Sequence, residues 1–218
     1  MKNRQISAII FDLDGLVLDT ESTYKIAWQQ AAQEMGYSFN EHFMQSLSGL
    51  HYNDLVLKLL NYCGQDFNLV EFNQKSSIYW HDYVASNRIK INHGFHDLLD
   101  AIQKKQIPFA LATNSQRHNA KHCLQLAGLE NTFSILISRD DVTHGKPAPD
   151  IFLKTAEKLA IPISQCLVLE DSLIGITAAH KAGAIPILIS SVAVIEPATE
   201  KMCHSVFNDL TEVLNLIN

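Results

Sequence analysis

Two patterns of apolar residues divide the chain. Between residues 18 and 89, three stretches repeat apolar side chains about every 3.6 residues, which is the period of an α-helix. These stretches are Tyr24 to Met35, Asn53 to Leu60 and Val70 to Val84. All six tyrosines and both tryptophans lie in this segment, whereas all six prolines follow it. We therefore predict a helical domain at 18–89 that is inserted into a second, different fold.

Outside this segment, short runs of apolar and β-branched residues alternate with helical stretches. The runs are 7–11, 107–113, 133–138, 165–170 and 185–190. The helical stretches between them are Leu98 to Lys105, Arg117 to Ala127, Ile151 to Leu159 and Leu173 to Ala182. Continuous rather than alternating apolar strands indicate a parallel sheet that is covered by helices on both faces. The predicted fold class is α/β, with a Rossmann-like three-layer core and an inserted all-helical domain.

Composition and charge narrow the class of protein. With 47% hydrophobic and 18% charged residues, the 218-residue chain has the composition of an ordinary globular protein. Its formal net charge of −6 repels nucleic acid and anionic membranes, so local groups have to bind any phosphate-bearing ligand. The four cysteines are far apart and form no C-x-x-C pair, which is typical of free thiols in a reducing compartment.

The sequence indicates neither export nor membrane insertion. Only four apolar residues, Ala8 to Phe11, precede Asp12, and this run is too short for a signal peptide. The longest apolar tract, Ala184 to Ile195, is interrupted by Pro186 and two serines and falls short of the roughly 20 residues of a membrane span. We therefore expect a cytoplasmic protein.

Polar residues follow three of the predicted strands. Asp12 and Asp14 come at the end of the first run, in FDLDG, and Thr113 ends the second run and begins TNS. Glu170 and Asp171 come at the end of the fourth run, in EDS. The carboxyl ends of parallel strands meet at one edge of a sheet, where ligands bind. Because neighbouring carboxylates raise each other's pKa unless a positive charge lies between them, we expect a cation among these residues.

The residue types fit the hydrolysis of a phosphate monoester. Asp12 can act as the nucleophile and form a mixed anhydride with the phosphoryl group. Asp14 can protonate the departing alcohol and then deprotonate the attacking water. Asp12 and Asp171 supply the oxygen ligands that Mg²⁺ prefers. Whether Glu170 joins them as a direct metal ligand stays open.

Three further residues are our candidates for binding the phosphate oxygens. Thr113 and Asn114 belong to TNS, and Lys146 lies in the loop HGKPAPD. Taken singly, each motif has an ordinary structural explanation: D-x-D-G is a common turn, EDS suits a helix N-terminus, and a lysine before proline is usually a solvated loop charge. Their joint appearance at the ends of successive strands favours a functional site.

These motifs occur in the order that is typical of one family. FDLDG, ALATNS, HGKPAPDIF and CLVLEDSLIGITAAHKAG together resemble subfamily I of the haloacid dehalogenase superfamily, in which a helical cap follows the first motif. The chain is similar to the pseudouridine-5′-phosphatase, 2-deoxyglucose-6-phosphatase and β-phosphoglucomutase groups. The resemblance implies that Asp12 is the nucleophile and that Asp14 is the acid/base and binds the metal through its carbonyl. It also implies a metal ligand at Asp171 and phosphate contacts at Thr113 and Lys146.

The resemblance also implies a cap that closes over the substrate. Two alternatives to a phosphatase stay open. Relatives that isomerise β-phosphoglucose carry a histidine after the first motif, where Tyr24 aligns, and a cap arginine where Tyr52 aligns. Both differences weaken the mutase hypothesis, and the two tyrosines are our candidates for contacts to the substrate. A phosphate-binding regulatory module without catalysis is a second alternative, and the complete set of motif residues argues against it.

We therefore predict a Mg²⁺-dependent phosphatase. It hydrolyses a small phosphomonoester of sugar or nucleoside type through an aspartyl-phosphate intermediate. The catalytic core is expected at 1–17 and 90–218, and the helical cap at 18–89. The expected partner is a small phosphorylated metabolite, without nucleic acid or membrane, and the expected state is a monomer.

Overall fold

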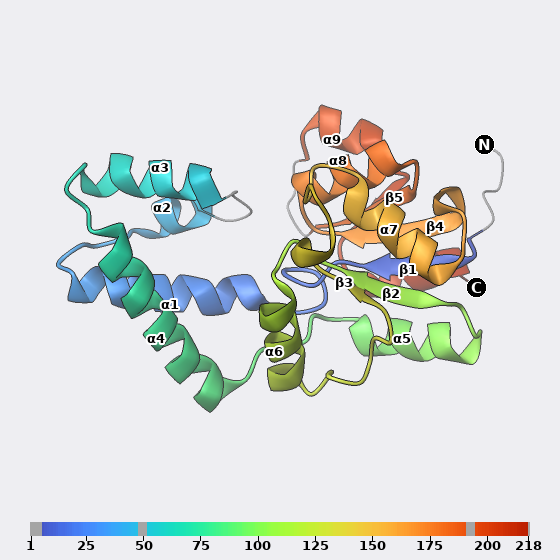
Figure 1. The fold of residues 1–218 in the computed structure, drawn as a ribbon, viewed down its shortest axis with the longest axis horizontal. Coiled ribbons are helices and arrows are strands. Elements are labelled where there is room, and N and C mark those ends of the chain that lie inside the picture. The colour runs from blue at the N-terminus through green and yellow to red at the C-terminus, as the bar shows by residue number, and fades with distance from the viewer. Residues whose placement is uncertain (1–5, 48–51, 191–194, 218) are drawn as a thin grey trace. The chain divides into compact units, whose positions relative to one another are not determined.

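Two compact units make up the chain in the computed structural model, which describes residues 6–47, 52–190 and 195–217 (Figure 1). The core unit consists of Met1–Asp19 and Lys90–Asn218, and the helical unit consists of Thr20–Ile89. None of the helices in the described ranges is long and apolar enough to cross a membrane.

The core unit contains a parallel sheet of six strands in the order β3-β2-β1-β4-β5-β6. The strands are β1 (Ala8–Phe11), β2 (Phe109–Ala112), β3 (Leu136–Ile137), β4 (Cys166–Glu170), β5 (Ile185–Ile189) and β6 (Ser205–Phe207). The predicted α/β class with a parallel sheet is confirmed. The sequence did not predict β6, because its three residues are too short a run to stand out as a strand.

Helices cover both faces of this sheet. They are α5 (Phe95–Lys104), α6 (Arg117–Ala127), α7 (Asp150–Leu159), α8 (Leu173–Ala182), α9 (Pro197–Met202) and α10 (Leu214–Ile217). The chain passes from β1 outward to β3 and then returns through β4 to β6, and parallel crossovers are right-handed. For this reason α5 and α6 lie on one face and α7, α8 and α9 on the other (Figure 1). The order therefore reverses between β1 and β4, which is where ligands bind in such sheets.

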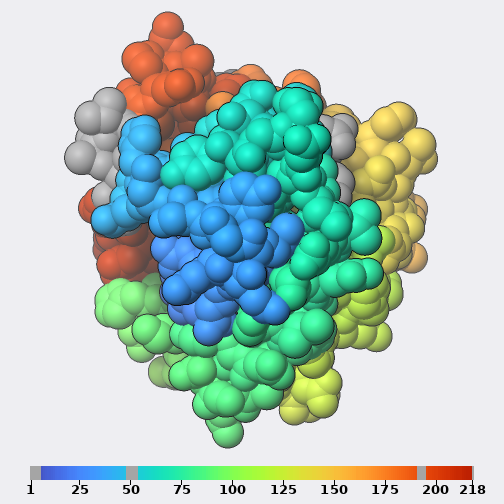
Figure 2. All heavy atoms as spheres, turned by 90° about the vertical axis from the view of Figure 1, so that its left-hand side faces the viewer, coloured from blue at the N-terminus to red at the C-terminus, as the bar shows by residue number. Residues whose placement is uncertain are grey.

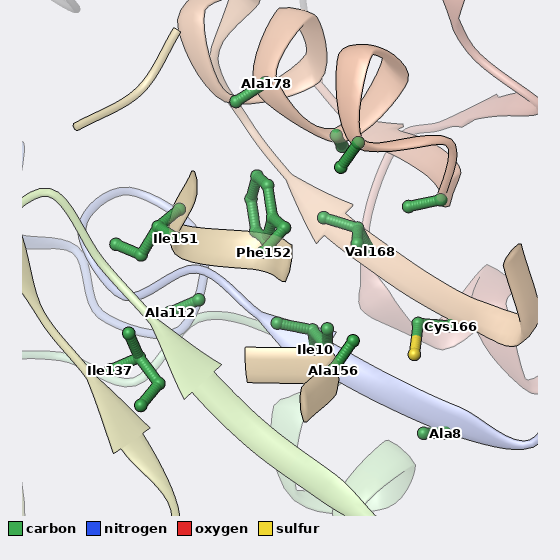
Figure 3. Close-up of a cluster of buried hydrophobic side chains, with 13 residues drawn as sticks. Ala8, Ile10, Ala112, Ile137, Ile151, Phe152, Ala156, Cys166, Val168 and Ala178 are labelled. Carbon is green, nitrogen blue, oxygen red and sulfur yellow. The ribbon is translucent and has the colours of Figure 1, made fainter. Parts of the chain in front are cut away.

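The central strand β1 is buried on both of its faces. Ile10 belongs to the cluster in which Phe152 of α7 packs against Val168 of β4 (Figure 3). The next residue, Phe11, points to the opposite face, where its ring lies edge-on to Phe95 of α5 at a centroid distance of 5.7 Å. Burial on both faces is the reason for the continuous apolar run that predicted this strand.

The described residues of the helical unit form four helices. They are α1 (Thr20–Glu34), α2 (Glu41–Ser46), α3 (Tyr52–Cys63) and α4 (Leu69–Asn87). The side chains of α1 (blue) and α4 (teal to green) lie side by side on the face that Figure 2 shows. The sequence did not predict the short helix α2, whose first turn is capped by Asn40, since the Oδ1 atom accepts a hydrogen bond of 2.8 Å from the Phe43 amide.

Replacing Ile10 by alanine tests the packing beneath the sheet edge. We expect Ile10→Ala to lower the free energy of unfolding by about 2–5 kcal/mol, because the cavity in the tightly packed cluster cannot collapse fully. Leu153→Ala on the outer face of α7 is the control, since 44% of that residue is already exposed. Chemical denaturation monitored by circular dichroism measures both changes. An equal loss for the two variants would contradict the described core.

Candidate active site

The residues that the sequence singled out in the core meet at the carboxyl ends of three strands. Asp12 follows β1, Thr113 follows β2, and Asp171 follows β4. The fourth contribution is the loop before α7, which carries Lys146. Because β1 pairs with both β2 and β4, these three strand ends are neighbours at the point where the strand order reverses.

Lys146 is the most heavily engaged side chain of this group. Only 5% of the residue is exposed. Its Nζ atom donates to Oδ1 of Asp12, to Oε1 of Glu170 at 2.5 Å and to the Ala112 carbonyl at 2.9 Å. All three ammonium donors therefore have oxygen partners. A lysine held in this way is not a solvated loop charge, so the ordinary explanation of the HGKPAPD loop does not apply.

The charges of the site are not balanced by these contacts. Burial, which the Lys146 ammonium only partly offsets, raises the pKa of Asp12 well above its ordinary value, and the carboxylates of Glu170 and Asp14 raise it further. Burial also disfavours the charged form of Lys146, yet Asp12 and Glu170 outweigh this effect and raise its pKa. One buried ammonium thus faces two buried carboxylates, which leaves room for a further positive charge.

The same carboxylates form a group that can hold a metal ion. Asp12, Glu170 and Asp171 each offer an oxygen atom, and these atoms lie within 4.8 Å of one another. Oxygen donors of this kind fit a hard cation such as Mg²⁺. Both oxygens of Glu170 already accept hydrogen bonds, from Lys146 and, at 3.0 Å, from the Ser172 hydroxyl. Which of the three carboxylates binds the metal directly stays a prediction.

Gly15 allows the chain to turn beside Asp171. Its φ angle of +87° lies in the left-handed region, which favours glycine. A Cβ atom at this position would lie 1.9 Å from Oδ2 of Asp171, which is far inside contact distance. The glycine of FDLDG therefore serves both the turn and the close approach of the Asp171 carboxylate to the backbone after Asp14.

Two hydroxyl groups hold the carboxylate of Asp14. Its Oδ2 atom accepts hydrogen bonds from Oγ of Ser115 at 2.7 Å and from Oγ1 of Thr113 at 3.2 Å. The Ser115 amide in turn donates to Oγ1 of Thr113 at 3.0 Å. Ser115 was not among the predicted site residues, although it is the third residue of TNS. The signal was its place in the TNS motif, three residues after the end of β2.

Asn114 uses its side-chain amide to hold the backbone of Lys146. Its Oδ1 atom accepts from the Lys146 amide at 2.8 Å, and its Nδ2 atom donates to the Lys146 carbonyl at 3.1 Å. Such a paired contact fixes the loop that carries the buried ammonium. The sequence predicted Asn114 as a phosphate contact; the structure brings it to the lysine loop, and the phosphate contact stays a prediction.

The two candidate substrate residues lie in the helical unit. Tyr24 on α1 is half-buried and stacks on Trp80 with a centroid distance of 5.4 Å and on Trp28 at 6.2 Å. Tyr52 is the first residue of α3, and its side chain lies outside the described part of the structure. Their contact with a substrate therefore stays a prediction.

Comparison with known proteins identifies relatives of this chain. The model of the family described as haloacid dehalogenase-like hydrolase matches residues 9–189. A phosphorylated carbohydrates phosphatase of Thermotoga maritima is 30% identical over 181 residues, which cover 82% of each chain. A probable pseudouridine-5′-phosphatase of Drosophila melanogaster is 30% identical over 85% of this chain and 82% of its own. The crystal structure of a putative β-phosphoglucomutase from Thermotoga maritima has a TM-score of 0.82 at 26% identity and covers 97% of this chain and 98% of its own.

The chain therefore belongs to the haloacid dehalogenase-like hydrolase family. The resemblance that the motifs indicated is confirmed, and so is the prediction of an enzyme of the phosphatase class.

Replacing Gly15 tests the close approach to Asp171. Gly15→Ala and Gly128→Ala both place alanine at a positive φ, so each variant loses about 1–2 kcal/mol of stability. Only at Gly15 does the added Cβ overlap a side chain, since no atom lies within 4 Å of it at Gly128. We therefore expect Gly15→Ala alone to weaken Mg²⁺ binding, by about 10-fold or more, as measured by calorimetric titration. Unchanged Mg²⁺ affinity in Gly15→Ala would contradict the assigned geometry.

Proposed function

We propose that this protein is a Mg²⁺-dependent phosphatase that hydrolyses a small phosphomonoester of sugar or nucleoside type through an aspartyl-phosphate intermediate. The observation that carries the proposal is the buried carboxylate of Asp12, which Lys146 holds at the switch point of the sheet beside Asp171. Two relatives whose names specify phosphatases of phosphorylated carbohydrates and of pseudouridine 5′-phosphate support the substrate class.

The roles of the residues in the first half-reaction follow from their contacts. Lys146 orients Asp12 by holding Oδ1, so the carboxylate can form an O–P bond while the bond between phosphorus and the ester oxygen breaks. Asp14, fixed by the hydroxyls of Thr113 and Ser115, gives its proton to the leaving ester oxygen. A Mg²⁺ ion held by Asp12 and Asp171 would supply positive charge for the phosphoryl oxygens.

The second half-reaction returns the enzyme to its starting state. Asp14 accepts a proton from a water molecule, whose oxygen then attacks phosphorus as the bond to Asp12 breaks. Inorganic phosphate leaves, and the proton that Asp14 gave up is restored. Lys146 keeps its place throughout, because its remaining contacts to Glu170 and the Ala112 carbonyl do not depend on the reaction.

The compartment, the partners and the oligomeric state of the enzyme are part of the same proposal. All four cysteines are free thiols, as expected for a cytoplasmic protein, and the net charge of −6 disfavours nucleic acid as a partner. We propose a monomer. Tyr24, whose ring is stacked on Trp80, and Tyr52 are proposed to contact the substrate.

A phosphosugar mutase is the second candidate function. It is favoured by the similarity to the structure titled a putative β-phosphoglucomutase. The two functions differ in the acceptor of the phosphoryl group, which is water in a phosphatase and a sugar in a mutase. Incubation with β-glucose 1-phosphate separates them, because a phosphatase releases free phosphate and a mutase yields the 6-phosphate.

Loss of the nucleophile and of the metal tests the proposed reaction. We expect Asp12→Asn to lower the rate of phosphate release from a panel of sugar and nucleoside monophosphates by at least about 10³-fold. The control is Asp100→Asn on α5, an exposed residue that carries the same change of charge, and it should keep the wild-type rate. EDTA should stop release, and added Mg²⁺ should restore it.

Two results would overturn the proposal. Substantial turnover by Asp12→Asn would reject the nucleophile, and turnover that is indifferent to EDTA would reject the metal. Complete absence of Mg²⁺-dependent phosphate release across the panel would instead favour a phosphate-binding module without catalysis.

A further inference from the structure

A cavity of about 820 Å³ lies along the free edge of the sheet in the core unit. Its walls come from α6, the segment 130–135, β3 and α7. Because α6 and α7 cover opposite faces of the sheet, the cavity borders the edge strand β3 between them (Figure 1). The volume is within the range of pockets that bind small molecules, and none of the candidate active-site residues lines it.

The charged groups around this cavity are mostly positive. The cavity is lined by four cations and two carboxylates. The cations are Arg117, Lys121, Lys154 and Lys158, and the carboxylates are Glu130 and Asp141. Arg117 pairs with Asp141 and neutralises it. Among the described residues, none of the three lysines makes an ion pair with a carboxylate. In a chain with a net charge of −6, this surplus of ammonium groups attracts an anion to the cavity.

Part of the cavity wall is apolar. Phe133, Ile135 and Leu136 line the cavity and are only half-buried. A bare inorganic anion would leave the exposed part of these side chains in contact with water. An organic anion with a ring or hydrocarbon body uses both the apolar wall and the lysines, which is the usual composition of a small-molecule site.

The edge strand itself offers little to a peptide. The carbonyls of Ile135 and Ile137 accept hydrogen bonds from the neighbouring strand and from Thr113, so the intervening Leu136 carbonyl points outward. Nη2 of Arg117 donates to this Leu136 carbonyl at 3.0 Å. Since β3 has only two residues and its outward carbonyl is occupied, addition of a strand is disfavoured and a small ligand is the better occupant.

The cavity wall is connected to the loop that holds Asp14. The amide of Arg117 donates to Oδ2 of Asp140 at 2.8 Å, and the amide of Arg139 donates to the Ser115 carbonyl at 3.1 Å. The hydroxyl of the same Ser115 donates to Asp14. A ligand that moves Arg117 or the turn Arg139–Asp141 therefore also acts on Ser115.

We propose that this cavity binds a small organic phosphate and that its occupancy changes the catalytic rate through the contact of Arg139 with Ser115. Lys121 and Lys158 bind the phosphate oxygens, and the apolar wall contacts the organic body. The ion pair of Arg117 with Asp141 stays intact, so a movement of Arg117 also moves the turn Arg139–Asp141. The binding part stands by itself, whereas the effect on rate rests on the proposed phosphatase function.

Binding is tested by amide NMR titration of the ¹⁵N-labelled full chain with ATP in Mg²⁺-free buffer. We expect saturable shifts of amides in α6 and α7, and at least about 10-fold weaker binding by Lys121→Gln/Lys158→Gln. The matched control is Lys104→Gln/Lys105→Gln, which makes the same change of charge at two exposed positions of α5 and its end and should bind as the wild type does. Inorganic triphosphate, which carries the same three phosphate groups without the nucleoside, should bind at least about 10-fold more weakly than ATP, because it has no organic body for the apolar wall.

Three results would overturn the binding site. They are shifts confined to the neighbourhood of Asp12 and Thr113, shifts at α6 and α7 that do not saturate, and equal affinity in the lysine variant and its control. Equal affinity for inorganic triphosphate and ATP would overturn the role of the apolar wall.

The effect on rate is measured separately, with p-nitrophenyl phosphate as substrate and free Mg²⁺ held constant. ATP should change kcat of the wild type and of the Lys104→Gln/Lys105→Gln control, but not of Lys121→Gln/Lys158→Gln. An identical response of all three proteins would overturn the coupling and leave the binding result intact. Absence of turnover in all three would count against the proposed function alone, since the NMR titration needs no catalysis.

Discussion

The ion pair of Lys146 with Asp12 and Glu170 is the constraint on which the candidate site depends. An unpaired charge at this depth would cost several kcal/mol, so the lysine and the two carboxylates require one another. Lys146 comes from a loop, and this loop needs its own support, which the side-chain amide of Asn114 provides through two hydrogen bonds to the lysine backbone. The position of the Asp12 carboxylate, the proposed nucleophile, is therefore set by contacts that reach across three strands and one loop.

A second consequence of this ion pair is its incomplete charge balance. One ammonium between two buried carboxylates leaves negative charge, and Asp171 adds another carboxylate close by. Gly15 permits this crowding, because a larger residue there would displace Asp171. The arrangement suits a cation, whose positive charge would attract an anionic phosphoryl group. It also explains how a chain with a net charge of −6 can accept a phosphate ester at all.

The sequence predicted the parts of this molecule that depend on local pattern. The continuous apolar run of β1 predicted a strand with two buried faces, and the bounds of α6 and α8 agree with the periodicity. The motifs also indicated the family, because their order along the chain is specific. The strand β6 and the helix α2 were not predicted, since they are short and gain their stability from packing rather than from a repeating pattern.

The sequence did not predict the contacts that complete the site, because these contacts join distant segments of the chain. The bond from Ser115 to Asp14 and the contacts of Asn114 with Lys146 join residues that are 101 and 32 positions apart. No spacing rule predicts which atoms such distant segments bring together. The sequence did not predict the cavity at the edge of the sheet either. Its lysines come from α6 and α7, which cover opposite faces of the sheet, and neither helix shows a basic cluster by itself.

A crystal structure of the protein with Mg²⁺ and beryllofluoride shows which carboxylate accepts the phosphoryl group, because beryllofluoride mimics a phosphoryl group on a carboxylate. We expect beryllium bonded to the side chain of Asp12, with the metal on Asp12 and Asp171 and with Lys146 still bound to Glu170. Beryllofluoride bonded to Asp14 instead, or Lys146 displaced into solvent with Asp12 unmodified, would contradict this expectation.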